Sequence, residues 1–519
     1  MVDKKKHVLA IDLGTGGVKA SVVDQAGQLM ASGLSSLEME ILPDGGAEQD
    51  TEKIWAAVVE ACKQALAAAA VPAQDIMAVI CSSQYMSVVP VDQHGTALMN
   101  MVLWLDTRGG PYNCDLYTRY PEALDIWSEI HGLPPLESGN DSLGHMLWVK
   151  NQRPQVYEKT AAFLEPADFV NLRLTGRITA NQCTVFPLLL TDNRQFNVRE
   201  YDQTLLAMAG IDENKLPELV DINSVVGCLL PAVAAELGLS AQTKVLAGLN
   251  DTQAGSVGTA SFQGNQAGLC IGTTTIIHAE VAFKRTAIEN LLVTMPGPFP
   301  GRNIVMAENG LGGKIVEHFL SEIIYGNDDL GRHGVCDIYA QLDNTVAHSR
   351  PGSGGLLFLP WLNGAYAPSA NPNARGGFLN MSMETTRGDL VRAVLEGIAF
   401  NARWLLSAVE NFSGRNFEHL VFAGGGAHSD VWAQIMADIM NKPIHQMADA
   451  RYVNSRGTGL LALIRLGYLK EEDAEIYCEI RKIFQPSGKN RSLYDNMYEQ
   501  FIQAFERNQP IFEALNAKL

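Results

Sequence analysis

Two short turns rich in glycine and threonine contain residues with an evident chemical use. The first is Gly14–Gly17, with Lys19 just beyond it, and the second is Gly272–Thr274. Glycines in a tight turn let consecutive backbone N–H groups converge on phosphate oxygens without a Cβ in the way. The Thr15 hydroxyl and the Lys19 ammonium would add a donor and a positive charge. Two such turns at matching places predict that one polyphosphate is held from both sides.

An aspartate precedes the first turn. Asp12 follows the apolar run Val8–Ile11, where its carboxylate could bind Mg²⁺ through water, as the hard cations that accompany nucleotides require. The alternative is a plain hairpin turn with an aspartate at the end of its first strand. The segment alone leaves both interpretations open.

A second aspartate, Asp251, lies in the segment VLAGLNDTQAGSVG, just after the apolar run Val245–Ala247. A carboxylate at a strand end among small residues can approach a substrate closely and take a proton from an attacking hydroxyl. The alternative is that Asn250 and Asp251 form an ordinary turn, and the local sequence by itself favours that alternative.

A triple glycine, Gly424–Gly426, separates a predicted strand from a helix whose first turn contains Ser429 and Asp430. Such a turn lets a flat ring or a phosphate lie against backbone and a helix N-terminus. The alternative is a crowded turn that needs small residues, with Asp430 as an N-cap.

These residues must be positioned by a repeated α/β framework. Both glycine–threonine turns lie within predicted β-hairpins, His7–Gly27 and Gln266–Phe283, about half the chain apart. Chance likeness of two hairpins is the alternative, but the near-equal halves favour duplication of one domain. We therefore expect domains at residues 1–250 and 251–519, with a cleft between them and a boundary near 246–260.

Each half continues with alternating helices and strands, as α/β layers require. In the second half, Thr386 and Asp389 have capping-box spacing at the start of a long helix. The other predicted elements are a helix at 51–70, a strand at 75–84, a strand–turn–strand at 87–106, a strand at 419–424 and a helix at 429–441.

Composition limits the partners. The 519 residues include 39 Lys and Arg against 57 Asp and Glu, a net charge of −18 that disfavours nucleic acid and anionic lipid. The eight cysteines, Cys336 among them, lack metal or disulfide spacing, and no apolar stretch is long enough for a membrane span. We expect a cytoplasmic protein with a small-molecule substrate; the oligomeric state stays open, with a homodimer as one alternative.

Other nucleotide motifs are absent or weak. No P-loop occurs, because Gly313 and Lys314 are followed by Ile315. The segment Gly457–Ala462 matches a dinucleotide-binding fingerprint in form, but it lacks a clear preceding strand. We interpret it as a site of helix packing.

Seven segments in order resemble the FGGY family of carbohydrate kinases from about Val8 to Gly467. They are AIDLGTGGVKASVVD, VLWLDTRG, PADFVNLRLTGRITAN, GLNDTQAGSVG, IGTTT, LPWLNGAYAPSANPNARGGF and FAGGGAHSDVWAQIMADIMNKPI. The resemblance implies two actin-like ATPase (ribonuclease H-like) domains of α/β class that close on a sugar and ATP-Mg²⁺. The two glycine–threonine turns would then be its phosphate loops.

The resemblance also implies roles for individual residues. Asp251 matches the catalytic base and Asp12 the metal-associated aspartate. Positions matching nucleotide contacts are Thr15, Gly16, Gly17, Lys19, Gly272, Thr273, Gly312, Gly313, Gly425, Gly426 and Asp430. Positions matching the acceptor site are Gln84, Tyr85, Met86, Trp104, Asp106, Asp251 and Thr252.

The acceptor segment departs from the family pattern. Gln84-Tyr85-Met86 stands where xylulokinases have Gln-Met-His and glycerol kinases have Gln-Arg-Glu. Because an unpaired buried hydroxyl costs about 1–3 kcal/mol, this exchange should change selectivity. The missing Arg-Glu pair argues against glycerol, and Asp251-Thr252 resembles xylulokinase-type members. For Trp104, Asp106 and Arg108, a buried tryptophan beside a salt-bridged turn is the structural alternative.

The sequence thus predicts an ATP-dependent kinase for a ketopentose such as xylulose, with another ketose or polyol as the next alternative. An ATP-switched binding protein and a degenerate sugar sensor without turnover remain the rival hypotheses. A pure ATPase switch would not need Asp251 together with the Gln84 and Trp104 segments.

Overall fold

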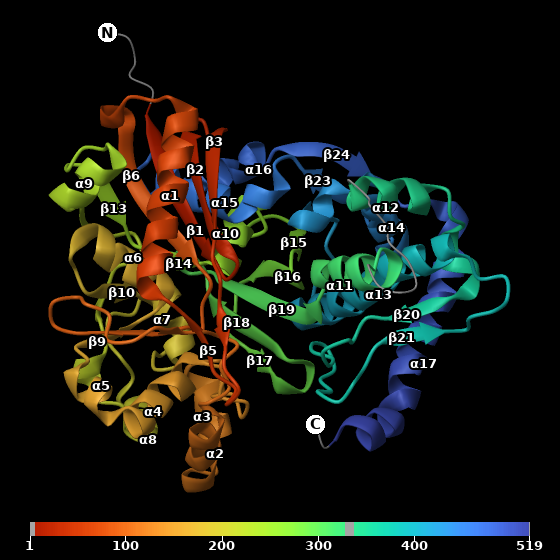
Figure 1. Ribbon diagram of the computed structural model, residues 1–519, viewed down its shortest axis with the longest axis horizontal. Helices are drawn as coiled ribbons and strands as arrows, with labels where there is room; N and C mark the ends of the chain where they lie inside the picture. The colour runs from red at the N-terminus through yellow and green to blue at the C-terminus, as the bar shows by residue number, and fades with distance from the viewer. Residues whose placement is uncertain (1–5, 327–336, 518–519) are drawn as a thin grey trace.

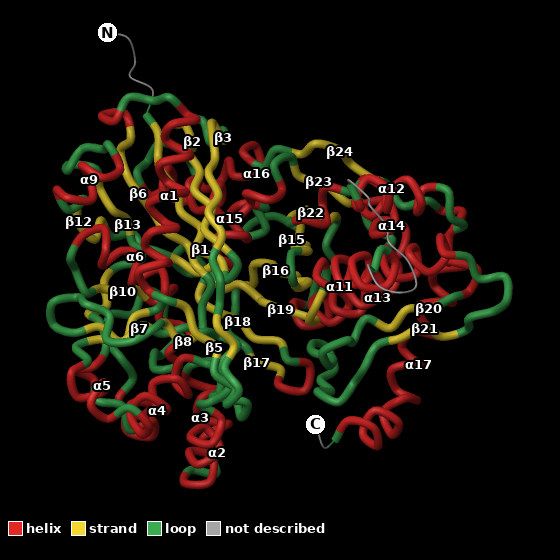
Figure 2. Tube along the Cα trace, viewed as in Figure 1, coloured by secondary structure: helices red, strands yellow, loops and turns green. Residues whose placement is uncertain are grey.

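The computed structural model describes residues 6–326 and 337–517 and has two lobes, each built around one mixed β-sheet (Figure 1). Figure 2 shows the strands in the interior, with helices around them. None of the helices within these residues is long and apolar enough to cross a membrane. Cys336 lies outside the described residues, and no two cysteines within them form a disulfide.

The sheet of the first lobe has the strand order β12-β13-β6-β1-β2-β3, with β14 beside β6. Strands β1, β2 and β3 are antiparallel neighbours, whereas β6 runs parallel to β1 and β13 runs parallel to β6. The bounds are β1 His7–Gly14, β2 Gly17–Asp24, β3 Leu29–Ser36, β6 Ile76–Ser83, β12 Val225–Cys228, β13 Lys244–Leu246 and β14 Leu249–Asn250.

The sheet of the second lobe has the order β17-β18-β19-β16-β15-β22-β23-β24. Its members are β15 Gln266–Ile271, β16 Thr274–Val281, β17 Thr286–Ala287, β18 Leu292–Pro296, β19 Asn303–Leu311, β22 His419–Ala423, β23 Ile444–Met447 and β24 Ile480–Phe484. The series β19-β16-β15-β22-β23-β24 repeats the pairing of β3-β2-β1-β6-β13-β12, parallel and antiparallel alike. The predicted hairpins and the predicted duplication are confirmed.

The long helices form where apolar periodicity and caps predict them. Helix α1 (Thr51–Ala69) covers β2 and β3. Helix α13 (Arg387–Ser413) begins with the predicted capping box of Thr386 and Asp389. Helix α14 (Asp430–Met440) follows β22 as predicted, but its N-cap is Ser429, whose side chain accepts from the N–H of Trp432. The suggestion that Asp430 is the N-cap is therefore wrong, because Asp430 is the first helical residue.

Helices α10 (Asp251–Gly258) and α15 (Val453–Arg465) pack against each other between the lobes. A Cβ on Gly457 would lie 2.1 Å from the carbonyl oxygen of Ala254, and one on Gly258 would lie 2.3 Å from that of Val453. The helix-packing interpretation of the Gly457 segment is confirmed.

A helical region extends the first lobe at the lower left of Figure 1. The predicted strand–turn–strand at 87–106 is confirmed by antiparallel bridges from Val88 to Val102 and from Val91 to Ala97. Its strands also pair with other segments, β7 (Val89–Val91) with β9 (Ala162–Leu164) and β8 (Met101–Val102) with β5 (Ala47–Gln49). The other helices of this lobe are α2 Gly110–Arg119, α3 Ala123–Ile130, α4 Ser142–Gln152, α5 Pro154–Lys159, α6 Pro166–Thr175, α7 Gln182–Val185, α8 Gln203–Ala209 and α9 Pro231–Leu237.

The second lobe carries its own additions. A two-stranded sheet of β20 (Leu357–Leu359) and β21 (Gly377–Leu379) packs near α13, and α17 (Arg491–Asn516) runs along the outer side (Figure 1). The shorter helices of this lobe are α11 Gly313–His318, α12 Ile338–Ala347 and α16 Ala474–Tyr477.

Candidate active site

Parallel strands of the first lobe bring the predicted base and the acceptor segment together. Strand β14 pairs with β6 so that Asn250 lies opposite Ser83. Asp251 follows the first strand and Gln84 follows the second, at the edge where carboxyl ends of parallel strands meet and ligands bind. Asn250 also caps α10 in a capping box with Gln253, which fixes Asp251 as the first residue of the helix.

The Asp251 carboxyl has a raised pKa. Burial raises its pKa to about 7, with further rises from Asp12 and Glu308, while the Thr252 N–H and Lys19 act in the opposite direction. It lines a cavity of about 120 Å³ together with Gly272 of the second turn. A base with a pKa near 7 matches the pH at which it would work.

Asp12 lies at the same edge of the first sheet, near enough for its charge to raise the pKa of Asp251. Ser82 Oγ donates to Asp12 Oδ1 at 3.1 Å, and Lys19 Nζ pairs with Asp12 Oδ2 at 3.3 Å. Within residues 6–326 and 337–517, no three Asp, Glu, His or Cys side chains form a metal-binding group. One carboxylate fits Mg²⁺ that keeps several waters and binds substrate phosphates.

The first glycine turn is tied to the acceptor segment. Thr15 Oγ1 donates to Gln84 Oε1 at 2.5 Å and accepts from Trp104 Nε1 at 3.0 Å. The hydroxyl predicted to contact phosphate is thus already used to connect the turn to Gln84 and Trp104. A Cβ on Gly16 would meet nothing within 4 Å, whereas one on Gly17 would lie 2.6 Å from the carbonyl oxygen of Ser35.

The second glycine turn is braced by backbone alone. The N–H of Gly312 donates to the carbonyl oxygen of Thr273, and that of Gly313 donates to the carbonyl oxygen of Gly272, both at 2.9 Å. Gly312 and Gly313 therefore hold the turn in place. A Cβ on Gly272 would meet nothing within 4 Å, so this residue leaves open space in the cleft.

A larger cavity of about 500 Å³ begins at the same turn and extends into the second lobe, a volume suited to a small ligand. Gly425 faces open space there, while Gly426 packs against Trp432. The lining residues are Gly272, Thr273, Gly313, Lys314, Val316, Glu317, Asp337, Tyr339, Ala340, Leu342, Asp343, Gly425, Gly426, His428, Ser429, Trp432 and Arg451. Gly272 thus lines both this cavity and that of Asp251.

Asp430 is placed differently from its predicted neighbours. Its carboxylate pairs with Lys482 at 3.0 Å and also with Arg481, both on β24. It lines another hollow, whereas the contact of this turn with the large cavity comes from His428 and Ser429.

Among the residues predicted for the acceptor site, Tyr85 lies near Asp251, whereas Asp106 is buried in an ion pair. Tyr85 lies near Asp251, since burial and then the Asp251 charge raise the pKa of its phenol, and the Thr252 hydroxyl opposes part of that rise. Asp106 is fully buried, with Arg108 as its ion-pair partner and a hydrogen bond from the Ala47 N–H. This arrangement favours the structural interpretation of the Asp106–Arg108 turn.

Trp104 and Met86 are the other two residues predicted for the acceptor site. Trp104 is partly buried and reaches the site through its bond to Thr15. Met86 has φ of 57°, a left-handed backbone that non-glycine residues seldom adopt, so the segment bends sharply after Tyr85.

The sequence did not single out Glu308, on β19, or Asp343, on α12. Glu308 raises the pKa of Asp251 from the second lobe, and Asp343 accepts from Ser429 Oγ at 2.6 Å in the large cavity. Strand register supplies the missing signal for Glu308, because it pairs with Ile276, which lines the Asp251 cavity. No comparable local pattern marks Asp343.

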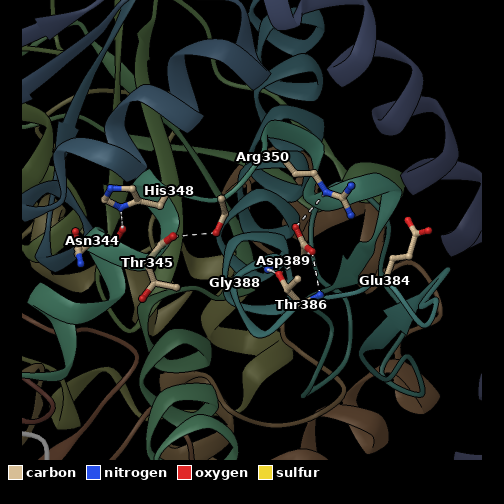
Figure 3. Close-up of a pocket in the computed structure, with 9 residues that line it drawn as sticks. Asn344, Thr345, His348, Arg350, Glu384, Thr386, Gly388 and Asp389 are labelled. Carbon is tan, nitrogen blue, oxygen red and sulfur yellow. Dashed lines mark hydrogen bonds and ion pairs between the residues drawn. The ribbon is translucent and has the colours of Figure 1, made fainter.

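A separate hollow of about 780 Å³ lies between the end of α12 and the start of α13. Figure 3 shows the residues that line it. Two of its charged side chains, Asp389 and Arg350, are paired with each other. Asp389 closes the capping box with Thr386 and pairs with Arg350 at 3.4 Å. None of the predicted site residues lines it.

Models of known families match most of the chain. The N-terminal domain of the FGGY family of carbohydrate kinases matches residues 7–258, and its C-terminal domain matches residues 269–464. The chain belongs to the FGGY family of carbohydrate kinases. The predicted family is confirmed, and the chain is a carbohydrate kinase.

This FGGY kinase has full-length relatives. A xylulose kinase of Bacillus subtilis (strain 168) is 29% identical, covering 99% of this chain and 99% of its own length. An autoinducer-2 kinase of Enterobacter sp. (strain 638) is 25% identical, covering 95% of this chain and 93% of its own.

Solved structures share its fold. A xylulose kinase from Lactobacillus acidophilus aligns with a TM-score of 0.84 at 21% identity, covering 97% of this chain and 98% of its own. A gluconate kinase from the same species aligns with a TM-score of 0.83 at 21% identity and the same coverage. The predicted two-domain, actin-like fold is confirmed.

Proposed function

We propose that this kinase transfers the γ-phosphoryl group of ATP to a hydroxyl of a small sugar, with a ketopentose such as xylulose as the acceptor. One observation carries the proposal: Gly272 lines both the large cavity and the Asp251 cavity. A nucleotide in the first would direct its phosphate tail past Gly272 toward a hydroxyl beside Asp251. The full-length relatives named xylulose kinase support the choice of acceptor.

Asp251 would act as the base. Its carboxylate would orient the acceptor hydroxyl and accept its proton as the phosphoryl group is transferred. The backbone N–H groups of the two turns would stabilise negative charge on that group. Closure of the lobes would exclude water, so that the sugar is phosphorylated in preference to hydrolysis of ATP.

Mg²⁺ fits this proposal through Asp12, whose carboxylate lies beside Lys19. When bound, the ion would neutralise phosphate charge. Asp12 would hold it through water, and Lys19 would hold Asp12 in position.

The remaining assignments stay predictions. We place the acceptor site and first phosphate loop in residues 1–250 and the nucleotide site in residues 251–519. We also keep a cytoplasmic location and the possibility of a homodimer. Gln84-Tyr85-Met86 keeps another ketose or polyol as a second candidate acceptor, because these side chains offer different partners to the hydroxyls.

Asp251→Asn tests the function directly. With ATP-Mg²⁺ and a panel of pentuloses, hexoses and polyols, we expect the wild-type protein to release ADP only when sugar is present. The variant should lose about 10²–10⁴-fold in kcat, since a general base contributes that much, while its affinity for ATP stays similar. Asp192→Asn, at a surface pair with Arg194, is the matched control.

Three results would contradict the proposal. Unchanged turnover of Asp251→Asn would reject the base. ATP hydrolysis that does not depend on sugar would favour the ATP-switched binding protein. Binding of a sugar without ADP release would favour the sensor.

The same carboxyl predicts a pH dependence. Its raised pKa of about 7 leaves Asp251 protonated and inactive as a base below that pH, and ionised above it. We expect kcat/KM for the sugar to increase as pH rises through about 7, measured by initial rates at saturating ATP. A kcat/KM that stays flat between pH 5.5 and 8.5 would show that no such group controls the reaction.

A further inference from the structure

The second lobe contributes a carboxylate to the acceptor side that the proposed reaction does not use. Glu308 on β19 lies directly opposite Ile276 on β16. Residues directly opposite in an antiparallel pair share a face of the sheet, and Ile276 lines the cavity of Asp251. Glu308 therefore stands on the face of the second sheet that borders the acceptor.

The electrostatic surroundings agree with this placement. The charge of Glu308 raises the pKa of Asp251 and of the phenols of Tyr85 and Tyr366. Burial raises the pKa of Glu308 itself to about 7, and no charged neighbour in the described part of the chain offsets that rise. Above a pH of about 7 the acceptor side therefore carries the negative charges of Asp251 and Glu308, and the nearby Lys19 is already paired with Asp12.

A family motif with no role in the proposed chemistry contacts the backbone at Glu308. The loop within LPWLNGAYAPSANPNARGGF brings the N–H of Ala367 to the carbonyl oxygen of Glu308 at 3.2 Å. Two residues further on, Gly310 has φ of 86°, and a Cβ there would lie 2.9 Å from the Tyr366 ring. The loop thus packs on the end of β19 and fixes the backbone from which the Glu308 side chain projects.

We propose that Glu308 selects the acceptor: its carboxylate accepts hydrogen bonds from the hydroxyls of an uncharged sugar and disfavours acceptors that carry a negative charge. This inference rests on the proposed kinase function and narrows its substrate class. A neutral ketopentose would gain a charge-assisted acceptor for its hydroxyls. An aldonate would bring its carboxylate beside two other carboxylates, and the nearby Lys19 is already paired with Asp12.

The test compares xylulose with gluconate at about pH 8.5, where Glu308 is ionised, using ADP release by the full chain with ATP-Mg²⁺. We expect wild-type kcat/KM to favour xylulose. Glu308→Gln removes the charge and keeps the shape, so the preference should narrow by about 10-fold or more. Glu308→Ala also removes the acceptor oxygen and should raise KM for xylulose by about 10- to 100-fold, the range of a lost charged hydrogen bond.

Glu280→Gln is the matched control, because Glu280 lies on the neighbouring β16 and pairs with Arg302 at 3.2 Å. It should leave the preference unchanged. An unchanged preference in Glu308→Gln, or a wild-type preference for gluconate, would overturn the role of Glu308 while the kinase function stands.

Failure of the kinase function itself would be seen separately, as no ADP release with any acceptor. Calorimetric titration of wild type and Glu308→Gln with xylulose and gluconate would then decide the inference. Tighter binding of xylulose by wild type, reduced in Glu308→Gln, supports it. Any other binding pattern, including no binding of either sugar, overturns it.

Discussion

The two glycine–threonine turns occupy equivalent places in the two sheets, yet their surroundings differ. In the first turn, the Thr15 side chain bonds to Gln84 and Trp104. In the second, the carbonyl oxygens of Gly272 and Thr273 accept from the backbone of Gly312 and Gly313. One duplicated hairpin thus connects to the acceptor segment, and the other connects to the large cavity. The difference supports the proposal that the first hairpin serves the acceptor and the second serves the nucleotide.

The largest difference between the two turns is expected when the same methyl group is added to each of them. Neither Gly16 nor Gly272 has a φ in the left-handed region, and a Cβ on either would enter open space. We expect Gly272→Ala to lower kcat/KM for ATP by about 100-fold, because Gly272 lies where the two cavities meet and a displacement of about 1 Å can cost that much. We expect Gly16→Ala to lower kcat/KM for ATP by about 10-fold.

Initial rates at varied ATP measure both variants, and circular dichroism checks that each is folded. Equal losses would mean that the two turns grip the phosphates alike. A larger loss in Gly16→Ala would reverse the assignment.

The sequence predicted the framework well because its signals are local. Apolar periodicity, the glycine turns and the Thr386 capping box are each written in a short segment, and each appears where it was expected. The strand–turn–strand at 87–106 is likewise present, but the pairing of its strands with β5 and β9 was not predicted, since these partners are distant in the chain. Local patterns do not show which distant strand completes a ladder.

The sequence predicted which residues lie in the site better than it predicted which residues they contact. Asp251 and Gln84 follow adjacent parallel strands, which the sequence could suggest. The hydroxyl of Thr15 shows the limit, because its partner Trp104 is far along the chain. Glu308 was missed for the same reason. It reaches the site only because it lies opposite Ile276 on the sheet of the second lobe.

A second prediction compares the threonine side chains of the two turns. Thr15→Val keeps the shape but leaves the Trp104 N–H and Gln84 without their partner, a loss of about 1–3 kcal/mol for buried groups. We expect KM for the sugar to rise about 10-fold, with KM for ATP changed by less than about 2-fold. Kinetics at varied sugar and varied ATP measure the two constants.

Thr273→Val in the second turn is the matched control, because Thr273 lines the large cavity. We expect Thr273→Val to raise KM for ATP and to leave KM for the sugar unchanged. A rise in KM for ATP in Thr15→Val, with the sugar unaffected, would mean that both turns serve the nucleotide.

The smallest effect is expected at Asp430, where the family resemblance and the structure point in different directions. The resemblance suggests a contact on the adenosine side, whereas the carboxylate is 41% exposed and pairs with Lys482 and Arg481. Exposed pairs contribute about 0–1 kcal/mol, so Asp430→Asn should change KM for ATP by less than about 2-fold and lower thermal stability slightly. Ser429→Ala, which removes the cap of α14 and a bond to Asp343, should weaken ATP binding more. If Asp430→Asn instead raised KM for ATP about 10-fold, the nucleotide would have to reach β24, and the second turn would no longer mark the near end of its site.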